Sequence, residues 1–328
     1  MNPKRSSPGE DMISVIILSY NTKDLLFACL ESVVAESGRW RGSVEIIVVD
    51  NGSADGSATA ARGSFPKVTV LENRENLGFA RGNNRGIQAS RGDPVIILNS
   101  DTVLMPGFFS AIERELYRSD GVGILAPRLL NADGTLQPSA YHHYPDPLVE
   151  IFGYTPLGGI ARRLFPGIGY PFRYELSPGE HETRREVSHV KGACLIMRRA
   201  LLDDIGGFDE DFFLYREETD FCKRARDRGW KIVYTPDIHV YHHHKASSRA
   251  LSDQGLSHRL TSHYLYLRKH HGRAARAAAY ATFALYALVM TALMAGAGLL
   301  RVGRAFPRSS YFARILGWHL RNPGRCLR

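Results

Sequence analysis

Through the first hundred residues, short apolar runs rich in β-branched residues alternate with segments whose apolar residues recur at helical spacing. Apolar positions recur at helical spacing after Thr22, and residues 78–89 also have the pattern of a helix. Strands that are apolar throughout and alternate with helices are typical of a mostly parallel sheet covered on both faces. The pattern therefore predicts an α/β domain. Its expected strands are residues 14–19, 45–50, 68–71 and 94–98.

The pattern changes in the second half of the chain. Residues 145–179 are rich in glycine, proline and aromatic residues, which predicts a long irregular loop, and loops of that length are usually functional. Regular structure is expected to resume over 187–197. A helix from about Arg216 to Arg228 and strands at 231–235 and 238–243 should follow.

A segment of 24 residues without a charge, 277–300, lies near the C-terminus and is long enough to span a bilayer as a helix. Seven arginines follow it, and simple crossing would place them on the far side, against the positive-inside tendency. A spanning helix, an in-plane or re-entrant helix and a helix buried in protein therefore all stay open.

Net charge is unevenly distributed. The chain carries +9 overall, but its last acidic residue is Asp253, and residues 254–328 contain 12 basic residues and no acid. These cations flank an apolar run instead of forming a basic recognition surface, so we expect an anionic membrane surface and no nucleic acid as partner.

Composition and cysteine spacing exclude other classes. With 44% hydrophobic residues and no low-complexity tract, the chain is expected to be globular. Four scattered cysteines without a CxxC pair argue against a disulfide framework or a thiolate zinc site, and they fit a reducing compartment. Residues 1–11 are polar and are expected to be disordered, without a signal peptide.

Three expected strands end in polar, turn-forming residues. Carboxyl ends of parallel strands share one sheet edge, where ligands of open α/β sheets bind. Asp50 could accept hydrogen bonds from a base or ribose, and Asp101 could hold a divalent cation; ordinary turn chemistry is the alternative. Neither G-x-G-x-x-G nor a Walker A loop follows the first strand. The three strand ends are Ser19-Tyr20-Asn21, Asp50-Asn51-Gly52-Ser53 and Asn99-Ser100-Asp101.

Three further segments have both a functional and a structural interpretation. The glycine-rich stretch 76–86, with Arg81, suits a phosphate at a helix N-terminus, but its glycines could equally serve helix packing. The acids of 216–220 suit the dipole of a helix, or one of them is a general base. His242 to His244 contain a possible metal ligand or form a solvated cluster.

Taken together, these residues resemble the family 2 inverting glycosyltransferases of the GT-A fold, especially the bacterial rhamnosyltransferase-like branch. The match runs from about residue 13 to residue 269. It rests on the order and spacing of six blocks, which are SVIILSYN, EIIVVDNGSADGS, ENLGFARGNNRGI, ILNSD, VKGACLIMRRALLDDIGGFDEDFFLYREETDFCKRARDRGW and VYHHHKASS.

The resemblance implies a donor site with a divalent cation, Mg²⁺ or Mn²⁺. Asp101 matches the last residue of the family's metal-binding Asp-x-Asp signature, whose first position is Asn99 here, and His242 matches a histidine at the same diphosphate–metal site. Asp50 would contact the base. The remaining implied donor-binding residues are Ser19, Tyr20, Asn21, Asn76, Gly78, Arg81, Asn84 and Ser100.

The resemblance also implies the catalytic base. The family pattern Glu-Asp-x-Asp reads Glu-Glu-Thr-Asp here, so Glu218 takes the position of the base, with Glu217 and then Asp220 as alternatives. Gly192 and Ala193 would line the acceptor side.

The expected protein is thus a metal-assisted inverting glycosyltransferase. It would move a sugar, rhamnose as first candidate, from a nucleoside diphosphate to a hydroxyl of a membrane-linked glycan or polyprenyl-linked acceptor. Residues 12–265 would form the GT-A domain, with a donor half to 130 and an acceptor half from 131. Residues 266–328 would be a basic helical tail that holds it at the cytoplasmic face of the membrane. A catalytically silent sugar-nucleotide-binding or membrane scaffold protein and a sugar nucleotidyltransferase are the alternatives.

Overall fold

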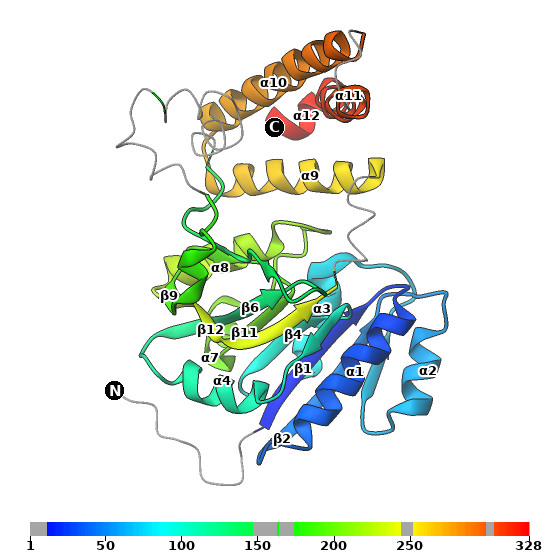
Figure 1. The fold of residues 1–328 in the computed structure, drawn as a ribbon, viewed down its shortest axis with the longest axis vertical. Helices are drawn as coiled ribbons and strands as arrows, with labels where there is room; N and C mark the ends of the chain where they lie inside the picture. Colours follow the sequence, from blue (N-terminus) through cyan, green and yellow to red (C-terminus); the bar gives the residue numbers. More distant parts are fainter. Residues whose placement is uncertain (1–11, 147–162, 164–173, 244–251, 300–304, 328) are drawn as a thin grey trace. The chain divides into compact units, whose positions relative to one another are not determined.

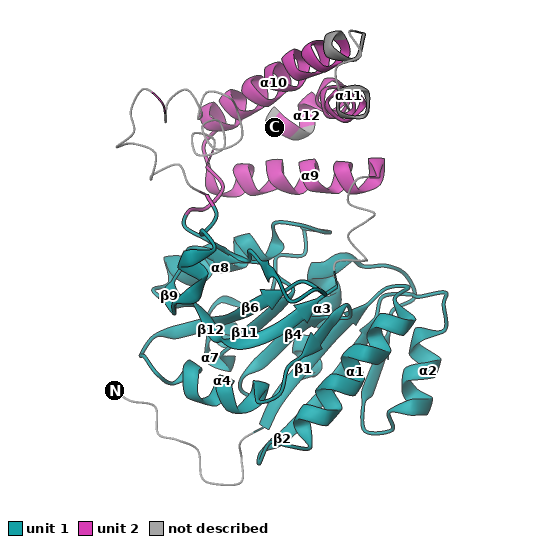
Figure 2. Ribbon diagram, in the orientation of Figure 1, with its two compact units in different colours: residues 1–142, 175–247 teal, residues 143–174, 248–328 magenta. Residues whose placement is uncertain are grey.

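The computed structural model describes residues 12–146, 163, 174–243, 252–299 and 305–327 (Figure 1). The chain divides into two compact units (Figure 2), the first of residues 1–142 and 175–247 and the second of residues 143–174 and 248–328. The predicted disorder of 1–11 and most of the predicted 145–179 loop lie outside the described residues. The predicted domain boundary at 265 falls inside a helix of the second unit.

The first unit is built on one mixed sheet whose main path has the order β3-β2-β1-β4-β11-β6-β12-β5. Its first four strands are parallel, as the alternation of strands and helices predicts. Register places Ser19 beside Asp50 and Leu18 beside Asn99, so the polar strand ends meet at one edge. These strands are β1 (Met12–Ser19), β2 (Ser43–Asp50), β3 (Thr69–Glu72) and β4 (Val95–Asn99).

Beyond β4 the sheet departs from the parallel pattern. β11 runs antiparallel to both β4 and β6, because the chain enters it from the carboxyl edge of the sheet. β12 is parallel to β6, and β5 pairs antiparallel with the end of β12. These strands are β5 (Thr102–Leu104), β6 (Val122–Leu130), β11 (Cys194–Met197) and β12 (Lys231–His242).

β12 corrects one sequence prediction. The two strands expected at 231–235 and 238–243 are one strand with an irregularity between Thr235 and His239. Short pairs complete the unit: β7 (Leu136–Gln137), β8 (Ala140–Tyr141), β9 (Arg185–Glu186) and β10 (His189–Val190), with a 3₁₀ turn at Gly179–Glu182.

Helices cover both faces of the sheet. Leu26 and Leu30 of α1 join the core cluster that includes Val15 and Ile17 of β1. The other face receives α3, whose Gly86 lies so close that an added Cβ would stand 2.3 Å from Ile16 Cγ2. The helices are α1 (Lys23–Ser37), α2 (Ser57–Ser64), α3 (Gly78–Ala89), α4 (Phe108–Leu116), α7 (Arg199–Ile205) and α8 (Glu217–Asp227).

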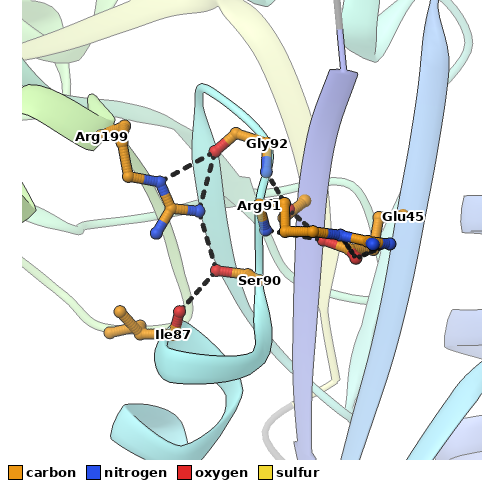
Figure 3. A network of polar contacts seen from close by, with 7 residues as sticks. Glu45, Ile87, Ser90, Arg91, Gly92 and Arg199 are labelled. Atoms are coloured by element: carbon orange, nitrogen blue, oxygen red, sulfur yellow. Dashed lines mark hydrogen bonds and ion pairs between the residues drawn. The ribbon is translucent and has the colours of Figure 1, made fainter.

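A polar network fixes the amino-terminal end of β4 (Figure 3). Arg199 donates through Nε and Nη2 to the Gly92 carbonyl at 3.2 and 2.9 Å, and through Nη2 to Ser90 Oγ at 2.9 Å. Arg91 pairs with Glu45 at 3.0 Å. These contacts tie α7, β2 and the α3–β4 turn together at the edge opposite the polar strand ends.

The second unit is helical in its described part. α10 and α11 pack together, with Tyr286 and Phe312 rings at 5.7 Å, and Tyr264 of α9 hydrogen-bonds His319 of α11 at 2.9 Å. The helices are α9 (Asp253–His270), α10 (Arg273–Leu299), α11 (Ala305–Arg321) and α12 (Pro323–Leu327).

α10 contains the apolar segment predicted at 277–300. Residues 273–295 are long and apolar enough to cross a membrane, with a mean hydropathy of 1.7. Only 11% of its most apolar 18-residue stretch is buried inside the structure. This disfavours the third alternative, a helix that is buried in protein.

Candidate active site

A chain of hydroxyls joins the ends of β1 and β4. Ser19 Oγ lies 3.0 Å from Thr22 Oγ1, which lies 2.8 Å from Ser100 Oγ. Thr22 is the residue before α1, and its side chain is used here instead of capping the helix. The sequence indicated Thr22 only as the residue before the first helix, so this link was missed.

Asp50 presents an unsatisfied acceptor at the end of β2. Its side chain is 2% exposed, and Oδ2 accepts the Ser53 N–H at 2.9 Å. Oδ1 is buried and has no hydrogen-bond partner among the described residues. A buried carboxylate oxygen without a donor is costly, so this atom suits a ligand N–H or hydroxyl.

Asn21 locks the neighbouring turn. It is left-handed at φ 53°. Its Oδ1 accepts the Ala54 N–H at 2.8 Å, and its own N–H donates to Ser53 Oγ at 2.9 Å. Tyr20 stays 38% exposed beside it, where its ring can contact a ligand.

Asn51 organises the glycine-rich segment, although the sequence indicated only a turn residue there. Its Nδ2 donates to Asn76 Oδ1 and to the Gly78 carbonyl, both at 3.0 Å. Its Oδ1 accepts from Asn73 Nδ2 at 2.7 Å. Asn76 is therefore engaged in shaping the start of α3.

Position 78 requires glycine because the Phe213 backbone lies close to it. Its φ is +81°, and an added Cβ would stand 2.3 Å from the Phe213 carbonyl oxygen. The Phe79 N–H donates to that same oxygen at 2.7 Å. The start of α3 is thereby fixed to the loop that leads into α8.

The structure argues against two predicted donor ligands. Arg81 pairs with Glu210 at 3.5 Å and lines a pocket of about 380 Å³. Three carboxylates line this pocket against one arginine, which disfavours a phosphate: Glu75, Glu210 and Asp211. Asn84 uses both hydrogens of its amide nitrogen on the Phe208 carbonyl and Glu210 Oε1, at 2.8 and 3.1 Å. We therefore assign both side chains to holding the 207–210 turn.

Asp101 and His242 face each other at 3.2 Å between Oδ1 and Nε2, and both are nearly buried. Gln137 Oε1 lies 2.7 Å from His242 Nδ1, so Nδ1 carries a hydrogen and donates it. The lone pair of Nε2 would then face the Asp101 carboxylate. Two electron-rich atoms at this distance are stable only when a proton or a cation lies between them. Orientation of a ligand histidine by an outer polar group is common at metal sites. Gln137 was not predicted.

The pair Asp101–His242 fits a cation but does not enclose one. The described residues contain no group of three or more His, Cys, Asp and Glu side chains that could hold a metal. Mg²⁺ bound with a diphosphate usually takes few protein ligands, so a pair of side chains is compatible with such an ion.

Residues 192–193 contact both sides of the site. The Ala193 carbonyl accepts the Asn99 N–H at 3.0 Å at the end of β4. A Cβ on Gly192 would lie 3.5 Å from Glu218 Cβ and 3.4 Å from Phe79 Cζ. The end of β4 and the start of α8 therefore share one short neighbouring segment.

α8 begins after an unusual turn. Tyr215 and Arg216 have φ of 71° and 70°, two consecutive left-handed non-glycine residues. Such strain costs energy and often occurs at functional sites. The turn places Glu217 and Glu218 in the first turn of α8. Each has a buried Oε2 to which no residue in the described part of the chain hydrogen-bonds.

Both carboxyls have raised pKa values. Burial raises the pKa of Glu217 well above its ordinary value, and the charge of Glu218 adds to this. Burial also raises the pKa of Glu218, while the charges of Arg216 and Lys191 oppose the rise. A carboxyl group whose pKa is raised toward neutral pH is suited to proton transfer.

Asp220, the third predicted acid, has a structural role. It is fully buried and accepts from Arg224 Nε at 2.8 Å. Arg224 also donates to the carbonyls of Ile205 and Gly207 at 2.8 and 2.7 Å, which ties α8 to the end of α7. We therefore do not assign the base to Asp220.

Residues 14–206 match the family model of glycosyl transferase family 2. The chain belongs to this family. It is 31% identical over 274 residues to an N-acetylglucosaminyl-diphospho-decaprenol L-rhamnosyltransferase of Mycobacterium tuberculosis, covering 80% of this chain and 85% of that protein.

Two more comparisons concern a similar sequence and a similar fold. A low-salt glycan biosynthesis hexosyltransferase of Haloferax volcanii is 29% identical, over 71% of this chain and 67% of its own length. A mannosyltransferase of Pyrobaculum calidifontis, solved with GDP-mannose and Mn²⁺, has a TM-score of 0.55 at 17% identity, covering 98% of this chain and 90% of that one. The predicted α/β GT-A fold and the transferase class are thereby confirmed.

Proposed function

We propose that this glycosyltransferase moves a hexose, rhamnose as first candidate, from a nucleoside diphosphate to a hydroxyl of a membrane-linked glycan or polyprenyl-linked acceptor, with inversion. The name of the Mycobacterium tuberculosis relative supports both the sugar and the lipid-linked acceptor. The tail would hold the chain at the cytoplasmic face, where its cations and the apolar α10 suit an anionic membrane surface.

The observation that carries this proposal is the shared contact of residues 192–193. Asn99 hydrogen-bonds Ala193, and Gly192 lies against Glu218. A sugar whose diphosphate lies near Asp101 would thus have the Glu218 carboxylate within reach on its acceptor side. A single inverting displacement requires the leaving group and the base to lie on opposite sides of the sugar ring.

On the donor side, Asp50 Oδ1 would accept from the base or ribose, with Ser19, Tyr20 and Asn21 around it. Asp101 and His242 would hold a divalent cation, Mg²⁺ or Mn²⁺. When bound, such an ion neutralises the charge that develops on a diphosphate leaving group. The Mn²⁺ in the mannosyltransferase structure supports this assignment.

On the acceptor side, Glu218 would take the proton of the attacking hydroxyl as its oxygen bonds to C1 and the C1–diphosphate bond breaks. The charges of Arg216 and Lys191 favour the ionised form that this role needs. Because burial raises the pKa of Glu218, we expect turnover to fall on acidification at a higher pH than an ordinary carboxyl would give.

The test of the base is Glu218→Gln, with the exposed Glu31→Gln as matched control. Loss of the proton acceptor should lower turnover by about 100-fold or more while nucleotide binding is retained. Transfer from dTDP-rhamnose, UDP-sugars and GDP-sugars would be measured by release of the nucleoside diphosphate. Full activity of Glu218→Gln, with Glu31→Gln also active, would refute this base.

The metal assignment is tested by chelation. EDTA should abolish turnover, Mn²⁺ or Mg²⁺ should restore it, and Asp101→Asn should raise the metal concentration needed for half-activity because one anionic ligand is lost. Activity that is undiminished after exhaustive chelation would remove the cation from the scheme.

A further inference from the structure

Arg276 in α10 is a buried cation to which no described residue gives a partner. The residue is 4% exposed, and its Nε and Nη1 are buried without a hydrogen bond to any part of the chain that the structure describes. Among the described residues no carboxylate forms an ion pair with it. The guanidinium is thus nearly removed from water without compensation from the protein.

The position of Arg276 on α10 explains its burial. Residues at helical spacing from it face the neighbouring helices of the second unit. Ala279 and Ala287 are buried, Tyr280 donates to the His319 carbonyl at 3.4 Å, and the Phe283 ring lies 5.6 Å from that of His263. Arg276 begins this inner face, where an apolar residue would be the ordinary choice.

Two effects make the site attractive to an anion. Burying an arginine without a partner is unfavourable, and an arriving anion would remove that cost. Arg276 also lies close to the N-terminus of α10, the positive end of the helix dipole, and the first turn contains no acidic residue. The unpaired guanidinium and the helix dipole both attract negative charge, so they act together on one anionic group.

The rest of α10 indicates which anion reaches this place. Its outward face carries exposed apolar side chains spaced three and four residues apart, Leu285, Leu288, Val289 and Leu293. No acidic residue occurs after Asp253. This apolar face lies on the side of α10 opposite the Arg276 side chain. A helix that combines such a face with cations at its N-terminal end is complementary to a bilayer with anionic headgroups.

We propose that Arg276 binds the phosphate of an anionic membrane lipid. It immediately precedes the charge-free segment 277–300, so it lies at headgroup level when α10 spans the bilayer. Its planar guanidinium offers the paired donors that phosphate oxygens accept. This inference rests on the proposed membrane-facing function and adds a specific lipid site to it.

The test measures the melting temperature of the full chain in dodecyl maltoside micelles, where α10 is kept in a lipid-like environment. Phosphatidylglycerol, phosphatidylcholine or inorganic phosphate is added to wild type, Arg276→Met and the exposed Arg273→Met. Saturating phosphatidylglycerol should raise the wild-type Tm by about 5 °C, because a ligand of the folded state stabilises it.

Arg276→Met should abolish this response, whereas Arg273→Met, which removes the same charge from the same helix end, should keep most of it. Without lipid, the Tm of Arg276→Met should equal or exceed that of wild type, since an unpaired buried charge is lost. Phosphatidylcholine and inorganic phosphate should have small effects.

Three outcomes would overturn the proposal. A lipid-free Tm of Arg276→Met several degrees below wild type would show that Arg276 stabilises the fold. Equal responses of the two variants to phosphatidylglycerol would show attraction by overall charge alone. An Arg276-dependent shift as large with inorganic phosphate would assign the site to a free anion. None of these measurements needs donor or turnover, so the result is independent of the Glu218 test.

Discussion

Glu217 and Glu218 are adjacent carboxyls with different expected roles. Glu217 is 4% exposed and its pKa is raised well above the ordinary value by burial and by the neighbouring carboxylate. Glu218 has the charges of Arg216 and Lys191 to favour its ionised form. We expect that Glu217 keeps its proton when Glu218 ionises, because the charge of Glu218 further disfavours a second charge on the buried Glu217.

This arrangement predicts a pH-dependent gain of stability for Glu217→Gln. The folded chain keeps the Glu217 proton over a pH range in which the unfolded chain loses it, so wild-type stability falls as pH rises toward the raised pKa. Glutamine does not titrate. The Tm of the variant relative to wild type should therefore be higher at about pH 7 than at about pH 4, below the ordinary carboxyl pKa.

Glu182→Gln is the control of opposite sign. The exposed Glu182 has a pKa lowered by its hydrogen bond to Arg128, so removing its charge should cost a little stability at neutral pH. If the Tm difference of Glu217→Gln were the same at both pH values, Glu217 would titrate as in the unfolded chain.

Single residues also show where sequence reasoning stops. The sequence singled out Asp50 and Asp101 from their positions at strand ends, and the structure buries both at one edge of the sheet. Arg81 and Asn84 have equally suitable chemistry in the sequence. Their partners, Glu210 and the Phe208 backbone, lie more than a hundred residues away along the chain, so only the folded arrangement reveals the competition.

At the scale of elements, glycines decide how closely helices approach the site. Gly78 and Gly192 both lie near aromatic side chains but differ in the room around them. At Gly78 the φ of +81° and a contact of 2.3 Å to the Phe213 carbonyl leave no space for a methyl group. At Gly192 the nearest atoms are at ordinary van der Waals distances of 3.4 Å and more.

The two glycines therefore predict contrasting variants. Gly78→Ala should lower the free energy of unfolding by about 1–3 kcal/mol or more, because it is both strained and overpacked. Gly192→Ala should leave the Tm unchanged but raise KM for the acceptor and lower turnover, since the methyl group projects beside Glu218. Thermal unfolding and kcat/KM distinguish the two. A Gly192→Ala enzyme with wild-type kinetics would remove this residue from the acceptor side.

The elements differed in how well the sequence predicted them. Helix 78–89 coincides with α3, and the four parallel strands were predicted within two residues at each end. The direction of β11 was not predicted, because a buried central strand is apolar throughout whether its neighbours are parallel or antiparallel. The break expected inside β12 is only a local irregularity, since pairing with β6 continues on both sides.

At the scale of the whole molecule, the core cluster contains residues of the first unit only. We expect a chain ending at Ser247 to fold, to bind nucleoside diphosphates and to stay in the supernatant when membranes are pelleted. The shortened chain lacks α9 to α12, and with them the apolar face of α10 and the excess of cations. The full-length chain is the control, and pelleting of the shortened chain would place the membrane contact within residues 1–247.

The sequence by itself determined the α/β class, the family and the candidate acids, because local periodicity and short motifs depend on neighbouring residues. It also revealed the charge asymmetry of the tail, which is a property of composition. Tertiary structure decided which of those side chains remain available to a ligand. Asn84 is occupied by the Phe208 backbone, far away along the chain, and Asp220 by Arg224, one turn further along the same helix. Asp50 Oδ1, Glu218 Oε2 and two nitrogens of Arg276, by contrast, are buried atoms that no described residue satisfies. Hydrogen-bond satisfaction depends on contacts between segments far apart in the chain, and these exist only once it has folded.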